Sequence, residues 1–255
     1  MTSRGTLCRF TAELLRKAKA GARAVYCGLS EKEALVSELG AYMDDFRAEH
    51  LPYALPTPLD DAEGRWPTDW GGRKAPCVFG QVYRDEALTL CSFTLRKRGM
   101  DIPLHDHPHM HGFLKVVTGA VEVDSYSWTE SADDDDSSAE SFDSVSSPSA
   151  YSRVGRRARH EGSQTLTAAD GCARLTPTRG NLHRVRALAD GSTIVDLLIP
   201  SYDPPAIDCH FFRVADSDQR LVGDKSATDC RLSEIAAPAA YWTCDWPSDG
   251  AGVVS

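Results

Sequence analysis

The chain has 255 residues, a hydrophobic fraction of 42% and a formal net charge of −9. This length fits one barrel-sized domain with extensions, and the hydrophobic fraction is sufficient for a sizeable core. Seven acidic residues and no Lys or Arg lie in residues 129–150, so the rest of the chain is nearly neutral. The charge therefore argues against a protein that binds nucleic acid or another polyanion.

The first residues contain no apolar run typical of a signal peptide, and no stretch is long enough to span a membrane. The eight cysteines are widely spaced and include no CxxC pair, which indicates reduced thiols rather than a disulfide framework. We therefore expect a cytoplasmic, and also nuclear, protein that makes no membrane contact and acts as a monomer.

Apolar residues recur at three-to-four spacing in residues 9–20 and 31–48, which predicts two amphipathic helices. Residues 30–33 (SEKE) have the pattern of a capping box at the start of the second helix. Residues 51–74 are rich in Pro, Gly and Trp, and we expect an irregular segment there. Together, residues 1–74 are predicted to form a helical and irregular extension that packs on the following domain.

From residue 77 onward, short runs of β-prone residues alternate with turn residues. Thr118-Gly119 is predicted to form a tight hairpin turn. The expected strands are residues 78–83, 88–96, 104–107, 112–117, 120–128, 165–166, 173–175, 183–187, 193–199 and 210–214. Many short strands without intervening helices predict a mainly β sandwich or barrel over residues 75–216. Residues 217–255 are expected to be a C-terminal segment that packs on this barrel.

An insert at residues 129–162 is predicted to interrupt the strands. Its acidic, Ser-rich part has the composition of a disordered segment, and several arginines follow it. A long insertion in a surface hairpin costs little stability. We interpret the segment as a tolerated insertion, and a regulatory loop is the alternative.

Three histidines carry the strongest chemical signal. His105 and His107 are one residue apart, so on a β-strand both side chains point to the same face. His183 returns from a distant predicted strand and could complete a three-point face on a metal ion, with open positions left for chemistry. Gly99 and Gly180 precede these histidines at spacings that resemble the paired motifs of the cupin superfamily. That resemblance implies a double-stranded β-helix barrel with inward-pointing histidines.

The local sequences resemble a narrower family, the thiol dioxygenases that include cysteamine dioxygenase and the plant cysteine oxidases. The resemblance lies in residues 102–116 (IPLHDHPHMHGFLKV), 180–183 (GNLH), 196–203 (DLLIPSYD) and 208–210 (DCH). It implies non-haem Fe(II) held by three histidines, which match His105, His107 and His183. It also implies reaction of O2 with an aminothiol to give a sulfinic acid.

Two substrates are compatible with this resemblance: the N-terminal cysteine of a protein or peptide, and free cysteamine. Oxidation of an N-terminal cysteine would imply an oxygen-sensing role in protein degradation. Asp196 and Tyr202 match acidic and phenolic positions that line the family's pocket. Asp196 lies in an apolar predicted strand, where a buried carboxylate needs a partner, either a ligand imidazole or the substrate amine. Tyr202 is predicted to contact oxygen or substrate, or else to pack at the barrel mouth.

Several positions depart from the family pattern. His111 stands where many cupins have a glutamate ligand, and three readings are open: a donor to a ligand, a core residue, or an extra ligand. His109 replaces a residue that is usually glycine, and we expect it to be exposed. Phe211 follows Cys209-His210 where a tyrosine is common, so the family's Cys-Tyr thioether crosslink is not possible at this position.

A metal-binding cupin that works as a sensor without turnover is a rival interpretation from another functional class. The three ligand histidines, together with Asp196 and Tyr202, argue against it. A cupin isomerase ranks last, because those sites often use a carboxylate ligand that this chain lacks.

Overall fold

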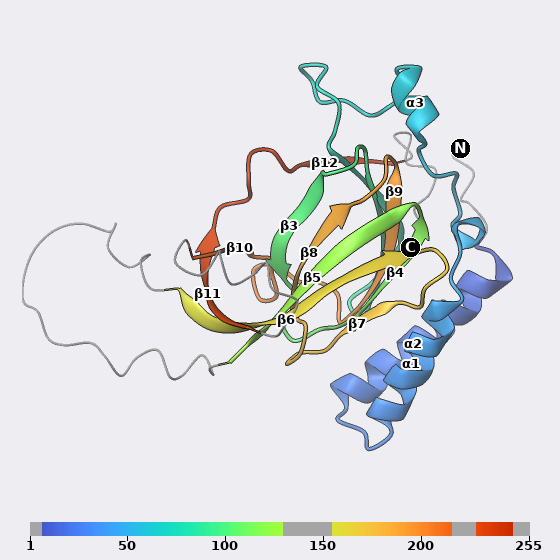
Figure 1. Cartoon of the computed structure of the whole chain (residues 1–255). Coiled ribbons are helices and arrows are strands. Elements are labelled where there is room, and N and C mark those ends of the chain that lie inside the picture. Colours follow the sequence, from blue (N-terminus) through green and yellow to red (C-terminus); the bar gives the residue numbers. More distant parts are fainter. Residues whose placement is uncertain (1–6, 130–154, 216–227, 247–255) are drawn as a thin grey trace, which may run out of the picture.

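The structure, a computed structural model, describes residues 7–129, 155–215 and 228–246. In these ranges the chain forms a few helices and two β-sheets (Figure 1). The helices are α1 (Arg9–Tyr26), α2 (Lys32–Asp44), the 3-10 helix η1 (Ala48–His50) and α3 (Pro58–Ala62). None of these helices has the length and apolar character needed to cross a bilayer.

The first sheet has six strands in the order β12-β1-β2-β9-β4-β7. They are β1 (Cys77–Arg84), β2 (Thr89–Leu95), β4 (His111–Thr118), β7 (Ala173–Leu175), β9 (Ser192–Ile199) and β12 (Thr243–Asp245). Its neighbours are antiparallel except β12, which pairs with β1 in parallel. The sheet therefore joins strands from both ends of the barrel sequence.

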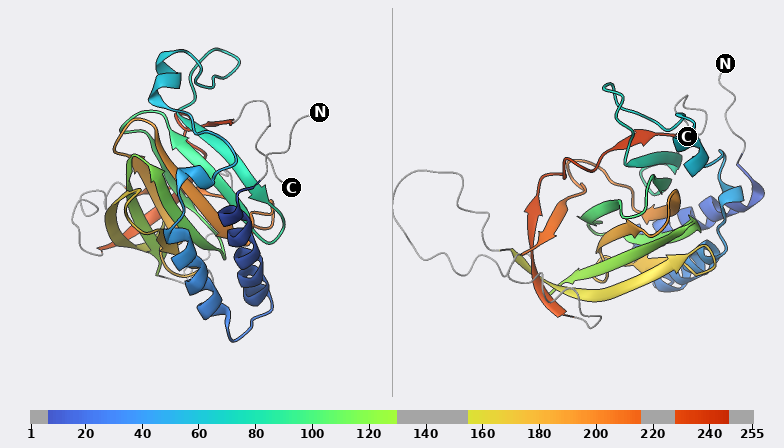
Figure 2. Two further views of the ribbon diagram at one scale, coloured as in Figure 1. Left: turned by 90° about the vertical axis from the view of Figure 1, so that its right-hand side faces the viewer. Right: turned by 45° about the horizontal axis from the view of Figure 1, so that its top comes forward.

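The second sheet has the order β10-β11-β6-β5-β8-β3 and closes on itself, because Phe211 in β10 pairs with His105 in β3. Its strands are β3 (Asp101–Asp106), β5 (Ala120–Trp128), β6 (Arg156–Thr167), β8 (Leu182–Ala187), β10 (Phe211–Val214) and β11 (Thr228–Ile235). The two sheets curve around a common interior (Figure 2). The expected double-stranded β-helix with N-terminal helices is confirmed.

The helices α1 and α2 lie side by side against the first sheet (Figures 1 and 2). Leu14 of α1 and Leu39 of α2 belong to one buried cluster with Leu90, Phe113 and Leu197 of the sheet. Apolar residues at helical spacing thus cover the outer face of β2, β4 and β9, and the N-terminal extension completes the core of that side.

Strand β9 is buried along its whole length. Val195 and Leu197 face the helices, whereas Ile194 belongs to the cluster between the two sheets. Because side chains alternate along a strand, Asp196 points to the same side as Ile194. The pleat of β9 therefore directs a carboxyl group into the barrel.

The predicted capping box at residues 30–33 is wrong. Helix α2 begins at Lys32, and the preceding Glu31 makes no side-chain capping bond. A capping box forms instead at α3, where the Thr57 amide donates to Asp60 Oδ2 at 2.8 Å and the Asp60 amide donates to Thr57 Oγ1 at 3.3 Å. The segment expected to be irregular thus contains a short helix, which the Thr-Pro sequence starts.

The second sheet extends further along the chain than predicted. Residues 156–162, expected to lie in the insert, belong to β6; residues 158–160 and 162 pair with β5, and residues 156–160 pair with β11. Residues 130–154 of that insert lie outside the described residues. The C-terminal segment, expected to pack on the barrel, contributes β11 and β12 to the sheets themselves. Cys230 and Leu232, two residues apart in β11, are both buried, so the strand contributes its own apolar face.

His109 lies in the turn between β3 and β4 and has a φ angle of 63°, in the left-handed region that favours glycine. Its side chain is exposed, as expected from the sequence. The position that glycine usually fills in the family is therefore one where the backbone conformation favours glycine.

We predict that His109→Gly raises the free energy of unfolding by about 1 kcal/mol. The left-handed conformation costs a residue with a Cβ about 1–2 kcal/mol, and the greater backbone entropy of unfolded glycine offsets part of this. Urea denaturation of the metal-free protein measures the change. Gly99→Ala, at a φ of 85°, is the reciprocal control and should lower stability. A less stable His109→Gly variant would contradict the assignment of backbone strain.

Candidate metal centre

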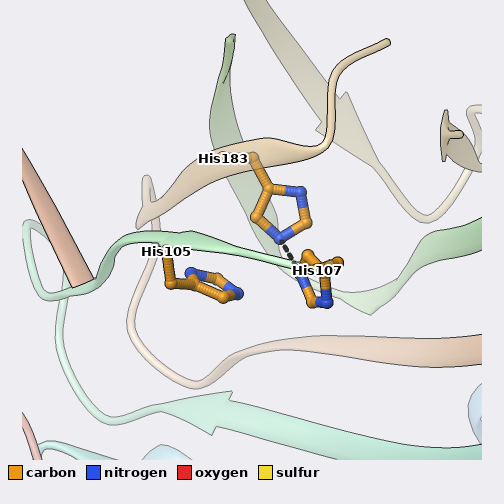
Figure 3. Close-up of side chains that lie close together, drawn as sticks. All are labelled: His105, His107 and His183. Carbon is orange, nitrogen blue, oxygen red and sulfur yellow. Dashed lines mark hydrogen bonds between the residues drawn. The ribbon is translucent and has the colours of Figure 1, made fainter. Parts of the chain in front are cut away.

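Strand pairing brings His105 and His183 together. Strands β3 and β8 are antiparallel neighbours, and His105 stands directly opposite His183 in their register. Such cross-strand pairs have Cβ atoms about 4.5–5.5 Å apart, so the two rings face the same space. The structure thus brings together two of the predicted ligands by β-sheet geometry alone (Figure 3).

His107 lies one residue beyond the end of β3 and is held by Asn181. The His107 amide donates to the Asn181 carbonyl at 3.1 Å, and Asn181 Nδ2 donates back to the His107 carbonyl at 2.6 Å. Asn181 is buried and precedes β8. This reciprocal pair ties the turn after β3 to the start of β8, so the third imidazole joins the other two.

The three imidazoles present nitrogen atoms to one point. Nε2 of His107 lies 3.2 Å from Nε2 of His183, and one nitrogen from each of the three rings lies within 4.8 Å of the others. Nitrogens bound at right angles to one divalent ion, at about 2.1 Å each, stand about 3 Å apart. The separation of the His107 and His183 nitrogens matches this value, and the three-histidine set could hold a single ion. It is the one cluster of at least three potential metal ligands within the described ranges.

All three rings are buried and neutral. Burial lowers the pKa of His105 to about 4, and burial together with the neighbouring imidazoles lowers the pKa of His107 and of His183 well below the usual value. His105 Nδ1 lies 2.8 Å from the Pro103 carbonyl, which can only accept a hydrogen bond. The proton of His105 is therefore on Nδ1, and the lone pair on Nε2 is available to a metal.

Tyr202 fixes the orientation of His107. The Tyr202 hydroxyl donates to the Asp106 carbonyl at 2.8 Å and lies 2.7 Å from His107 Nδ1. Because the hydroxyl proton is used by the carbonyl, Nδ1–H of His107 donates to the hydroxyl oxygen, which leaves the Nε2 lone pair facing the other rings. The structure thus brings Tyr202 against a candidate ligand as well as into the cavity beside it.

Asp106 connects this turn to β10. Its carboxylate accepts a hydrogen bond from the His210 amide at 2.8 Å and lies 3.3 Å from His210 Nδ1. Asp106 and Asn181 are therefore positioning residues that the sequence reasoning assigned no role. Their only signal was their place inside the two histidine motifs, next to His105 and His183.

A cavity of about 230 Å³ opens beside His105 and His107. Its other lining residues are Phe79, Arg84, Thr89, Cys91, Phe93, Ile102, Asp196, Leu198, Tyr202, Cys209, Phe211 and Tyr241. Most of these side chains are apolar or aromatic, so the cavity favours a small ligand that is desolvated when it binds. Tyr241, which comes from the C-terminal segment, was not predicted to contribute.

Asp196 is the one carboxylate among the described residues that line this cavity. It is 5% exposed, and its carboxylate oxygens accept no hydrogen bond from the described part of the chain. Burial alone raises its pKa to about 7. Because an unpaired buried carboxylate is costly, its place at a cavity favours a role toward a ligand.

His111 lies outside the three-histidine cluster, at the first residue of β4. It is partly buried, and burial and the positive charge of Lys32 lower its pKa. Its Nδ1 is buried without a hydrogen-bond partner among the described residues, and His111 is not part of the cluster as a fourth ligand. The donor set is three neutral imidazoles without a carboxylate.

The cysteines have no disulfide role. All eight lie within the described residues, and none of them forms a disulfide there. Cys91, Cys209 and Phe211 line the cavity. Because residue 211 is a phenylalanine, it has no phenol ring with which Cys209 could form a thioether crosslink.

A double-stranded β-helix with three convergent imidazoles defines the chain as a cupin-fold protein with a site able to bind one metal ion. The PCO_ADO family model matches residues 30–253, and the chain belongs to this family. Among solved structures, the similarity to KdgF from Halomonas sp. has a TM-score of 0.32 at 17% identity, covering 50% of this chain and 82% of that chain.

Three relatives are similar to the chain in sequence. The chain is 32% identical over 180 residues to 2-aminoethanethiol dioxygenase of Homo sapiens, covering 68% of this chain and 62% of that protein. It is 31% identical over 222 residues to the Mus musculus protein of the same name, covering 83% and 78%. It is 25% identical over 193 residues to plant cysteine oxidase 1 of Arabidopsis thaliana, covering 72% and 57%.

We predict that Asp196→Asn stabilises the metal-free protein more at pH 8 than at pH 5. The Asp196 pKa rises from 3.8 to about 7 on folding, so the protonated carboxyl favours folding at low pH and this contribution is lost as the pH rises through 7. The free energy of unfolding of the asparagine variant, relative to that of the wild type, should be about 3 kcal/mol higher at pH 8 than at pH 5. Other titratable groups that line the cavity are Cys91, His105, His107, Tyr202, Cys209 and Tyr241.

Urea denaturation at the two pH values measures this difference. The wild-type protein supplies the reference at each pH, which removes the contribution of every group that both proteins share. A gain that is the same at pH 5 and pH 8 would show that the Asp196 carboxyl is not buried as an unpaired acid.

Proposed function

We propose that the protein is a non-haem Fe(II) thiol dioxygenase that converts an aminothiol to a sulfinic acid, with the N-terminal cysteine of peptides as its substrate. The observation that carries this proposal is the cluster of three neutral imidazoles beside a small apolar cavity with one unpaired carboxylate. The names of the relatives, 2-aminoethanethiol dioxygenase and plant cysteine oxidase, support the reaction class.

His105, His107 and His183 would hold the metal ion. Imidazole ligands suit several divalent metals, but Zn²⁺ has no accessible second oxidation state, so a redox reaction favours iron. Bound Fe(II) would supply the redox chemistry that joins O2 to the substrate thiolate. Three neutral ligands leave the ion its full positive charge, which favours an anionic sulfur ligand.

The remaining groups act through hydrogen bonds and charge. Tyr202 keeps the His107 proton on Nδ1 and so keeps Nε2 directed at the metal position. Asp196, when ionised, would bind the substrate ammonium group, which has no other carboxylate partner among the described cavity residues. The apolar walls exclude water from the thiolate.

The overall reaction balances without a further reductant. A thiol, R–SH, and O2 give R–SO2H, in which both oxygen atoms end on sulfur and the sulfur supplies all four electrons. No co-substrate site is therefore required. Oxidation of an N-terminal cysteine in this way would mark a protein for degradation when oxygen is present.

Free cysteamine is the second candidate substrate, because two relatives carry the name 2-aminoethanethiol dioxygenase. Both substrates share the thiol and the amine that the site would recognise, and they differ only beyond the carbon that carries the amine. We further propose that the protein works as a monomer in a reducing compartment, the cytoplasm. The lack of a disulfide among the eight cysteines of the described residues supports this compartment.

Mass spectrometry tests the reaction directly. A Cys-initiated peptide incubated with the Fe(II)-loaded protein in air should gain two oxygen atoms on the cysteine, whereas its Ala-initiated control should not change. His183→Ala should lose both metal binding and this product, because two imidazoles remain. Full turnover by His183→Ala would contradict the three-histidine site, and unmodified peptide with the wild-type protein would overturn the N-terminal cysteine as its substrate.

Tyr202→Phe should weaken Fe(II) binding by about 10-fold or more, because His107 Nδ1–H loses its acceptor and the ring its fixed orientation. An anaerobic titration against a competing chelator measures the affinity. Tyr53→Phe is the matched control, since Tyr53 is a tyrosine whose hydroxyl lies 3.0 Å from Ser92 Oγ, away from the histidines. Equal Fe(II) affinities of wild type and Tyr202→Phe would contradict this positioning role.

A further inference from the structure

Arg84 places a positive charge at the mouth of the cavity. It is the last residue of β1, it is exposed, and its side chain lines the cavity that His105 and His107 also line. Its Nη2 donates to the Tyr202 main-chain carbonyl at 3.0 Å. A guanidinium group has five N–H donors, so most of them are left for a ligand.

Arg84 and Asp196 line the same cavity but do not neutralise one another. Neither forms an ion pair within the described ranges, where the salt bridges lie elsewhere on the molecule. The cavity therefore offers a carboxyl group, anionic when ionised, in its buried part and a cation at its mouth. A complementary ligand carries an ammonium group inside and hydrogen-bond acceptors outside.

Arg84 and His107 contact opposite ends of Tyr202. Arg84 donates to the main-chain carbonyl of Tyr202, whereas the hydroxyl at the end of the Tyr202 side chain contacts His107. A ligand whose sulfur lies beside the histidines would therefore meet Arg84 with groups beyond the residue that carries the sulfur.

We propose that Arg84 is a specificity residue that binds main-chain carbonyl oxygens of the peptide following an N-terminal cysteine. This inference rests on the proposed thiol dioxygenase function and selects between its two candidate substrates. Cysteamine has no carbonyl acceptor, and its thiol and amine are both used inside the cavity. A peptide has an acceptor at every residue, and an arginine donates to such acceptors without reading the sequence.

Steady-state kinetics with three substrates tests Arg84→Ala: cysteamine, L-cysteine, and an uncharged Cys-initiated pentapeptide amide. The KM for the pentapeptide should rise about five- to tenfold, as expected for loss of one or two exposed hydrogen bonds to a charged donor. Its kcat should stay within about twofold, because the group lies outside the reacting atoms. The constants for cysteamine should not change. An effect on L-cysteine as large as on the pentapeptide would show that Arg84 binds a carboxylate on the cysteine itself, which overturns the proposal.

Two further variants separate recognition from structure. Arg213→Ala is the matched control, because Arg213 is an exposed arginine of β10 that lines a different groove, beside Asp101 and Phe212. Arg84→Lys should restore part of the pentapeptide KM. Equal losses with all three substrates would mean that Arg84 only supports the Tyr202 loop, and an unchanged pentapeptide KM would equally overturn the proposal.

A binding measurement keeps this inference distinct from the proposed reaction. A Ser-initiated pentapeptide amide cannot be oxidised, and its binding to the protein is measured by titration calorimetry. Arg84→Ala should weaken this binding by the same factor as the KM change. Normal sulfinate formation with unaltered binding by Arg84→Ala removes only the role of Arg84, whereas absence of sulfinate with every thiol removes the proposed function itself.

Discussion

The pairing of β3 with β8 is the constraint on which the site depends. It sets His105 opposite His183, and the same residue His105 pairs with Phe211 where the second sheet closes. A shift of the β3–β8 register by one residue would turn the imidazole of the shifted strand to the other face, so the histidines would no longer converge. The closure of the second sheet and the convergence of the candidate ligands therefore both depend on the position of His105 in β3.

The polar groups around this pairing give the site its chemical state. The Pro103 carbonyl accepts a hydrogen bond from Nδ1–H of His105, and the Tyr202 hydroxyl accepts one from Nδ1–H of His107. The Nε2 atom of each ring therefore carries a lone pair before any ion binds. Burial keeps the imidazoles neutral. Asp196 differs from these residues, because its buried carboxyl has no hydrogen-bond partner among the described residues. Such a group lowers the stability of the fold, and a role in binding a ligand explains why it is there.

Local spacing was sufficient to predict the short strands and to single out the three histidines, because strand periodicity and short motifs are encoded in neighbouring residues. The cavity position of Asp196 was predicted only from the resemblance to the thiol dioxygenases. The His107–Tyr202 contact depends on how the chain turns after β9, and the Asn181 pair depends on two loops far apart in the sequence, so neither could be derived from spacing. Strand β11 was missed because its apolar face consists of only two buried residues, Cys230 and Leu232, and so short an alternation is recognisable only beside β6 and β10.

The central claim is that three imidazoles alone hold the reactive metal. Anomalous diffraction at the iron edge, from crystals of the protein loaded with Fe(II) without oxygen, tests it most directly. We predict one peak per chain, with Nε2 of His105, His107 and His183 as its protein ligands. A peak elsewhere, or one with Asp196, His111 or another side chain as an additional ligand, would contradict the claim.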